Sequence, residues 1–262
     1  MVIKSRLFKT SVNCEEEFYN VSLCLCEIDK LNDIIKENKI NTILLNYKLP
    51  NFFHLKELKI LSQTSCESKI KDYLLGRYAT KKALFSLFSY LNLKEILIKN
   101  GIFNQPIIEN CQKNLSATIS HSKNLGISLV FDSSLIFGVD VEKYDIKKID
   151  SLKRLINPKE INLLKDLELD LSRKLMILWV IKEALGKCLK TGINVNLKIL
   201  DINQIHIVNE KIIGDFKNFP QYKFITFNYA DFNIAIVCPK NLNFNLSSES
   251  LSFLPVCNLM VV

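Results

Sequence analysis

Three acidic residues stand where they could bind a metal ion together. Asp140 and Glu142 alternate along a strand-like run, so their side chains point to the same face. Glu183 lies further along, on a helix-like stretch that also carries Lys182 and Lys187. Carboxylate oxygens suit Mg²⁺, a hard ion that keeps several waters and often bridges substrate phosphates. Three acids with two lysines therefore predict a site for a metal-bound polyphosphate.

The segment LIFGVDVE, 135–142, is expected to form the strand that positions the first two acids. Phe137, Val139 and Val141 fall on its other face. Gly138 shares the acidic face, and we expect it to leave room above the strand for a pyrophosphate to approach closely.

A helix is predicted over 170–190, and a helical wheel shows on which side of it the third acid, Glu183, lies. Glu183 and Lys187 form an i,i+4 pair at the side of the apolar face. Lys182 falls within the apolar face, where an unpaired charge is costly. Either its stem lies along the core with the ammonium at the rim, or it meets an anion there.

The remaining elements predict an α+β fold with largely antiparallel sheets. A second helix is expected over 66–91, and strands over 20–28, 41–47, 117–121, 126–132, 222–229 and 232–238. YATKKALFSL, 78–87, aligns with WVIKEALGKCL, 179–189, and ATISHSKNLGISLV, 117–130, more weakly with FITFNYADFNIAIV, 224–237. These two internal similarities predict two pseudo-symmetric halves, 1–133 and 134–262, with the active site in a cleft between them.

Composition limits the class of protein. A hydrophobic content of 48% with 24% charged residues is typical of a globular protein, and the apolar run LMILWVI is far too short to span a membrane. The N-terminal residues show no apolar signal segment, so a cytoplasmic protein is expected. The eight cysteines are scattered apart from one CxC, which favours reduced thiols over zinc. The net charge of +8 leaves several anionic partners open.

Upstream, Ser120 and His121 stand at a strand end or turn in ATISHSKN. A histidine without other functional groups is more often structural than functional, but this one precedes the acidic strand closely.

Together these residues resemble the 4′-phosphopantetheinyl transferase superfamily, in its long, Sfp-type class. The family pattern G-[IV]-D-x-E matches 138–142, and W-x-x-K-E-[AS]-x-x-K matches 179–187. The Ser-His pair matches Ser120 and His121, and an LxGRxxxxKAL helix matches 74–84. A Gly-Lys-Pro segment matches only in part, as NQP, where Gln105 replaces the common lysine before Pro106.

The resemblance implies transfer of the 4′-phosphopantetheine arm of coenzyme A to a serine of an apo acyl or peptidyl carrier protein. The products are the holo carrier and 3′,5′-ADP, and the carrier could serve fatty acid, polyketide or nonribosomal peptide synthesis. Mg²⁺, with Mn²⁺ as the other candidate, would be the cofactor. The implied protein is a cytoplasmic monomer with neither nucleic acid nor membrane as a partner.

The resemblance also implies residue roles. Asp140, Glu142 and Glu183 would hold the metal, and Glu183 would be the general base. Coenzyme A would contact a larger set: Arg77, Gln105, Pro106, Ser120, His121, Asp140, Lys182, Glu183 and Lys187, with Lys81 as an alternative to Arg77 at the 3′-phosphate. Lys182 would otherwise brace the helix. Catalysis would rest on Glu183, Lys187 and Asp140.

Two alternatives stay open. A metal-dependent nuclease also uses an acidic strand followed by Glu and Lys, although there the pair usually lies on a strand. A non-catalytic coenzyme A-binding relative or scaffold would use the same residues without chemistry, and it predicts that Glu183→Ala leaves function intact.

Overall fold

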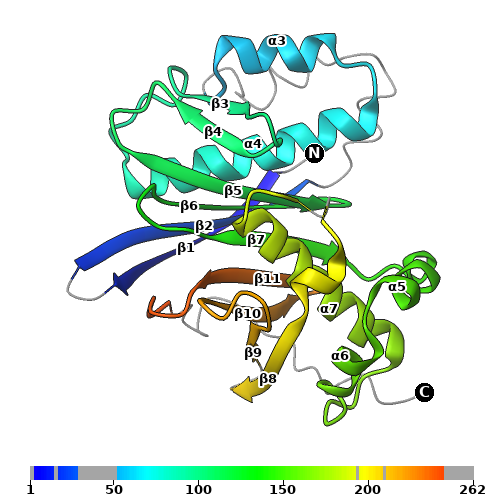
Figure 1. Ribbon diagram of the computed structural model, residues 1–262. Helices are drawn as coiled ribbons and strands as arrows, with labels where there is room; N and C mark the ends of the chain where they lie inside the picture. Colours follow the sequence, from blue (N-terminus) through cyan, green and yellow to red (C-terminus); the bar gives the residue numbers. More distant parts are fainter. Residues whose placement is uncertain (1–2, 15–16, 29–51, 193–194, 209–210, 245–262) are drawn as a thin grey trace. The chain divides into compact units, whose positions relative to one another are not determined.

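The computed structural model describes residues 3–14, 17–28, 52–192, 195–208 and 211–244 (Figure 1). Helices and antiparallel sheets are mixed along the chain, which confirms the α+β class. Contacts divide the chain into two compact units, Met1–Leu135 and Ile136–Val262. None of the described helices is long and apolar enough to cross a membrane. The strand expected over 41–47 lies outside the described residues.

The first unit contains a four-stranded antiparallel sheet in the order β1-β2-β6-β5. Its strands are β1 (Ile3–Cys14), β2 (Glu17–Ile28), β5 (Leu115–Ser122) and β6 (Leu125–Asp132). The unit also contains the helices α3 (Leu55–Gln63) and α4 (Glu67–Leu87) and a hairpin of β3 (Leu97–Asn100) and β4 (Pro106–Glu109). Helix α4 packs against β2, β5 and β6, so its apolar residues and those of the sheet form one core.

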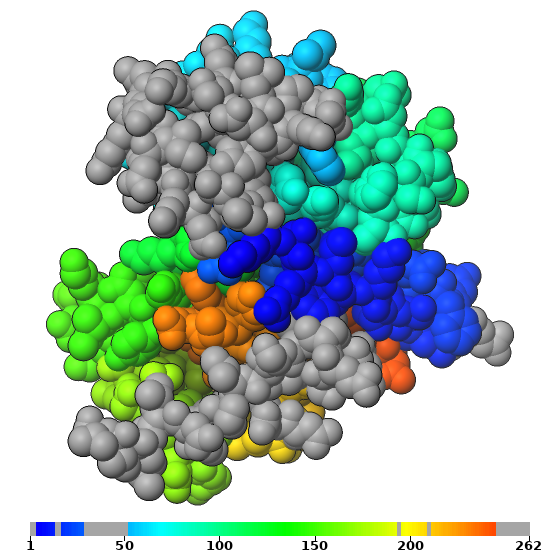
Figure 2. All heavy atoms as spheres, turned by 180° about the vertical axis from the view of Figure 1, so that it is seen from behind, coloured from blue at the N-terminus to red at the C-terminus, as the bar shows by residue number. Residues whose placement is uncertain are grey.

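Strand β1 is an edge of this sheet, and the sequence did not predict it. Figure 2 shows its atoms, in dark blue, at the molecular surface. Lys4, Arg6 and Lys9 are exposed along it. Charged side chains on an edge strand discourage pairing with another chain. They also leave only a weak alternation of apolar and polar residues along β1.

The second unit contains a five-stranded antiparallel sheet in the order β7-β11-β10-β9-β8. Its strands are β7 (Gly138–Lys143), β8 (Ile202–Val208), β9 (Lys211–Phe216), β10 (Tyr222–Tyr229) and β11 (Phe232–Pro239). Its α-helices are α5 (Ile149–Leu155), α6 (Pro158–Asn162) and α7 (Leu171–Cys188), and short 3-10 helices cover Ile146–Lys148 (η2) and Leu197–Leu200 (η3).

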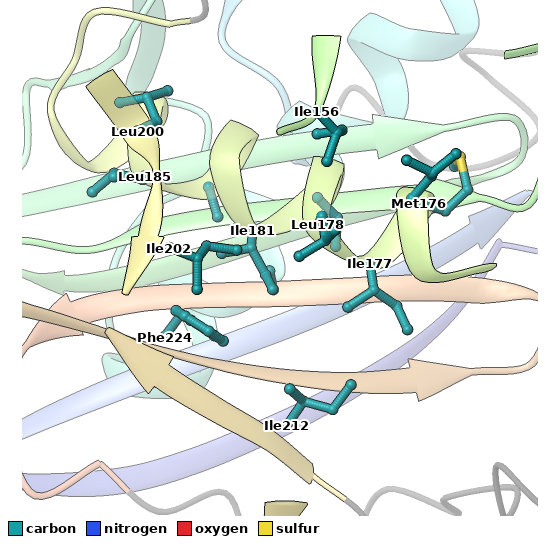
Figure 3. Packing of buried hydrophobic residues seen from close by; sticks show 14 of the residues in the cluster. Ile156, Met176, Ile177, Leu178, Ile181, Leu185, Leu200, Ile202, Ile212 and Phe224 are labelled. Atoms are coloured by element: carbon teal, nitrogen blue, oxygen red, sulfur yellow. The ribbon is translucent and has the colours of Figure 1, made fainter. Parts of the chain in front are cut away.

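Helix α7 is the central packing element of the second unit. Its N-cap is Asp170, whose side chain accepts a hydrogen bond from the backbone N–H of Arg173. Ile177, Ile181 and Leu185 belong to a buried cluster (Figure 3) that also includes residues of β8, β9 and β10. This apolar stripe fixes which face of α7 is turned toward the sheet, and so fixes the directions of its polar residues.

The two units share one local arrangement. Helix α4 packs on β2, β6 and β5, and α7 packs in the same way on β7, β11 and β10. Lys81 of α4 forms an ion pair with Glu57, and Lys182 of α7 forms one with Glu160. Both glutamates are the N3 residues of capping boxes, in α3 and α6. The internal similarity between 78–87 and 179–189 therefore corresponds to helices in equivalent places.

Candidate active site

Strand β7 and helix α7 approach each other closely at Gly138. A Cβ atom added there would lie 2.0 Å from the carbonyl oxygen of Ala184 and 2.6 Å from the backbone nitrogen of Cys188. The expectation that this glycine leaves room for a pyrophosphate is therefore wrong, because the backbone of α7 fills the space. The glycine instead brings the acidic strand and the helix that carries Glu183 into direct contact.

Asp140 is buried beneath α7, and its partner there is Lys187. The Lys187 ammonium donates a hydrogen bond to Asp140 Oδ1 at 2.7 Å. The Asp140 side chain is 6% exposed, whereas that of Lys187 is 27% exposed. A charge-assisted bond of this kind holds the lysine over the strand while its ammonium keeps access to solvent.

Glu142, two residues further along the same face, is bound by Lys148 of η2. The Lys148 ammonium donates to both carboxylate oxygens, each at 2.9 Å. Lys148 cannot be recognised as a site residue from the sequence, because periodicity does not show that the turn after β7 brings its side chain back over the strand. The signal available was a lysine in the 3-10 turn directly after the acidic strand.

Glu183 lies in the field of both strand acids. Burial raises its pKa from the ordinary 4.5 to about 7, and repulsion from Asp140 and Glu142 adds to the effect, while Lys187 and Lys148 oppose it. Glu183 therefore lies within electrostatic range of the two acids. A carboxylate with a pKa near 7 is suited to accept a proton at neutral pH.

The three acids do not form a ready metal cage in the structure. Across the residues that the structure describes, no group of three or more His, Cys, Asp or Glu side chains is arranged to hold a metal ion. The two strand acids instead have lysine partners. The donor set nevertheless has the chemistry of a site for a hard divalent cation, because all its groups are carboxylates, and repulsion from Asp140 and Glu142 adds to the burial that raises the pKa of Glu183.

Lys182 meets anions within the apolar core, which is one of the two possibilities that the sequence left open. Its side chain is 1% exposed, and its ammonium lies 2.9 Å from Glu160 Oε1 and 3.1 Å from Asp201 Oδ1. It also donates to the carbonyl oxygens of Leu197 and Leu200. The anion expected at this lysine is supplied by the protein itself, which favours bracing of the helix over a contact with coenzyme A.

The assignments of Arg77 and Lys81 to the 3′-phosphate are corrected for a similar reason. The Arg77 guanidinium donates to the carbonyl oxygen of Ile98 at 2.9 Å and to the side chain of Asn100, and it lies over the ring of Tyr73. The ammonium of Lys81 is buried and bonds to Glu57 and to two backbone carbonyl groups. Because both cations are buried and hydrogen-bonded within the first unit, neither is placed to bind the 3′-phosphate.

The other predicted coenzyme residues of the first unit lie in two places. Ser120 is buried on β5, whereas His121 is exposed and pairs with Asp72 of α4 at 3.4 Å, so the two side chains point to opposite faces of the strand. Pro106 begins β4. Gln105 precedes it, and its side-chain oxygen accepts a hydrogen bond from the backbone N–H of Phe103.

Comparison with known proteins gives one family match. Residues 136–237 match the family model described as ACPS, 4′-phosphopantetheinyl transferase superfamily. No curated protein matches the chain significantly. The matched segment includes β7, η2 and α7, and thus the residues gathered around Glu183. Residues 136–237, less than half of the chain, are accordingly similar to the 4′-phosphopantetheinyl transferase superfamily.

Proposed function

We propose that the protein transfers the 4′-phosphopantetheine arm of coenzyme A to a serine of an apo acyl or peptidyl carrier protein. The observation that carries the proposal is Glu183, whose pKa is raised to about 7 beside Asp140 and Glu142 on the matched domain. The long, Sfp-type class is part of the proposal, on the motifs at 74–84, 120–121 and 138–187.

The chemical step needs a base and positive charge. The serine oxygen forms a bond to the phosphorus that carries the pantetheine, and the bond from that phosphorus to the oxygen of 3′,5′-ADP breaks. Glu183 takes the proton of the serine, directly or through water, because a neutral hydroxyl is a poor nucleophile. Its raised pKa fits this role at neutral pH.

Asp140, Glu142 and Glu183 are the residues that would hold Mg²⁺ or Mn²⁺, which when bound would neutralise charge on the pyrophosphate. Lys187 keeps a partly exposed ammonium at the same place and would add positive charge where the leaving group becomes anionic. Asp140 holds that ammonium in position.

Ser120, His121, Gln105 and Pro106 are proposed to contact coenzyme A on the strength of the sequence resemblance. His121 pairs with Asp72 on an exposed part of β5, so its imidazole is accessible to an anionic ligand in a way that the buried Arg77 is not. The cytoplasmic location, the monomeric state and the absence of nucleic acid and membrane partners are likewise proposed.

The nuclease alternative is less well supported, because Lys182 and Glu183 lie on helix α7 and Lys182 is bound in the protein interior. A non-catalytic relative would have no use for a base with a pKa near 7. The nuclease alternative also does not account for the family match at 136–237.

Intact mass spectrometry tests the proposal directly. Apo carrier protein is incubated with coenzyme A, Mg²⁺ and either the wild-type enzyme or Glu183→Gln. We expect the carrier to gain the mass of one phosphopantetheine arm with the wild type and metal only. Absence of any gain with carriers from all three pathways would refute the transferase, and an equal gain with Glu183→Gln would refute the role of this residue.

A further inference from the structure

The clearest feature of the site that the proposed mechanism leaves unused is Lys148. Its ammonium donates to both oxygens of Glu142 at 2.9 Å. The Glu142 side chain is 16% exposed and that of Lys148 is 43% exposed. The pair therefore joins a nearly buried acid to a cation whose head group has open access to solvent.

The backbone beneath Lys148 is fixed, although its side chain is exposed. Asp145 is the N-cap of η2 and accepts from the backbone N–H of Lys147 at 3.0 Å, while Ile149 directly after Lys148 is buried. The Cα atom of Lys148 is thus held near Glu142, and only its flexible stem decides where the ammonium lies.

The neighbouring lysines do not share this position. Lys143 follows Glu142 in β7 and so points to the opposite face, where its ammonium lies 3.9 Å from Asp231 and over the ring of Phe232. Lys147 is exposed on the same 3-10 helix as Lys148.

Resting on the proposed function, we propose that Lys148 is a further binding residue of the site and couples the metal ion to the anionic substrate. Without a cation, Lys148 neutralises Glu142. A divalent cation bound by Glu142 displaces the ammonium, which then adds positive charge beside the metal-bound pyrophosphate.

The coupling follows from competition for one carboxylate. The cation alone must break the Lys148–Glu142 pair, so it binds weakly. With pyrophosphate present, the displaced ammonium gains a new anionic partner, so cation and pyrophosphate each strengthen binding of the other. Lys148 would in this way disfavour loading of the site by metal without coenzyme A.

Calorimetric titration with Mn²⁺ and with inorganic pyrophosphate tests this on the full chain. We expect Lys148→Met to bind Mn²⁺ alone about twofold to fivefold more tightly, the effect expected of losing a half-exposed ion-pair competitor. With excess Mn²⁺, the same variant should bind pyrophosphate more weakly by a similar factor. Lys148→Arg, which keeps the charge, should resemble the wild type.

Lys147→Met is the matched control, because it removes the same charge from the same 3-10 helix. A change in Mn²⁺ affinity no larger for Lys148→Met than for Lys147→Met would overturn the inference. Tighter binding of pyrophosphate by Lys148→Met would also overturn it, as would the absence of Mn²⁺ binding by both the wild type and Lys148→Met. Thermal melts check that the variants are folded. Both titrations are independent of carrier modification, so this inference and the transferase activity can fail separately.

Discussion

The ammonium of Lys182 lies 2.9 Å from Oε1 of Glu160, and the side chains of both residues are almost completely buried. The same oxygen of Glu160 accepts from the backbone N–H of Ile202 at 2.8 Å. The first unit repeats the arrangement, with Lys81 at Glu57 and the backbone N–H of Ile98 at Glu57 Oε1. In each unit a buried glutamate therefore joins a short capped helix, the start of a strand and the central helix.

Loss of this lysine should destabilise the protein strongly. Lys182→Met leaves Glu160 buried without its cation, and breaking a buried ion pair in this way costs about 3–5 kcal/mol. Urea unfolding followed by circular dichroism measures the change. Lys153→Met is the control, because Lys153 pairs with Asp150 in the open, with side chains 50% and 88% exposed. That variant should cost less than about 1 kcal/mol.

The double variant Lys182→Met with Glu160→Gln should recover part of the loss, because residue 160 is then neutral and no longer a buried carboxylate without its cation. A cost for Lys182→Met as small as that for Lys153→Met would show that the buried pair is not a structural element. Coenzyme A binding in a folded Lys182→Arg protein should stay unchanged.

Gly138→Ala should test the contact between β7 and α7. The added Cβ atom would meet the carbonyl oxygen of Ala184 at 2.0 Å, so the helix must shift away from the strand. Such overpacking costs about 1–3 kcal/mol or more, measured by urea unfolding. Gly192→Ala provides a comparison, since its Cβ would meet nothing within 4 Å and only the positive φ of 59° adds strain, about 1–2 kcal/mol.

The effect on function separates the two glycine variants. Shifting α7 moves Glu183 and Lys187 relative to Asp140, so Gly138→Ala should lower the rate of carrier modification well beyond its effect on stability. Gly192→Ala should leave the rate close to that of wild type. Equal rates for the two variants would contradict the role assigned to Gly138.

The sequence predicted the elements of strong period and missed those without one. Helix α7 and strand β7 were found because apolar residues recur at helical and strand spacing. Strand β8 was missed because it is mostly exposed and its pairing with β9 is irregular between Ile202 and Gln204. Strands β3 and β4, which form a hairpin, have four residues each, so they are too short to show an alternation of apolar and polar residues.

The candidate site was predictable as a set of residue types but not as a set of partners. The wheel placed Lys182 on the apolar face, yet its anions, Glu160 and Asp201, come from separate elements that only the fold brings together. Lys148 reaches Glu142 through a turn, which no periodicity encodes. Conversely, Gly138 was correctly placed on the acidic face, but its neighbour is a helix backbone that a strand pattern cannot reveal.

Arg77 and His121 should behave oppositely when replaced. Arg77→Met removes the bond to the Ile98 carbonyl and the contact with the Tyr73 ring, so the free energy of unfolding should fall by about 1.5–3 kcal/mol. The KM for coenzyme A should change little in the folded protein. His121→Ala removes an exposed side chain, so it should leave stability nearly unchanged and raise that KM severalfold. Destabilisation by His121→Ala without a change in KM would contradict this division.

The stability of the metal-free protein should depend on pH through Glu183. Burial and the neighbouring acids raise its folded-state pKa to about 7, above the ordinary 4.5, so the folded state binds the proton more tightly than the unfolded chain does. The contribution of this group to stability is therefore greatest below about pH 4.5, falls as pH rises to about 7, and is constant above it. Glu183→Gln cannot ionise, so at pH 8 it should be about 1–3 kcal/mol more stable than wild type. Unfolding with urea at pH 5 and pH 8 measures the difference, which should shrink at pH 5 because Glu183 is then largely protonated in the folded state. An advantage of the same size at both pH values would mean that the ionisation of Glu183 is not what destabilises the site.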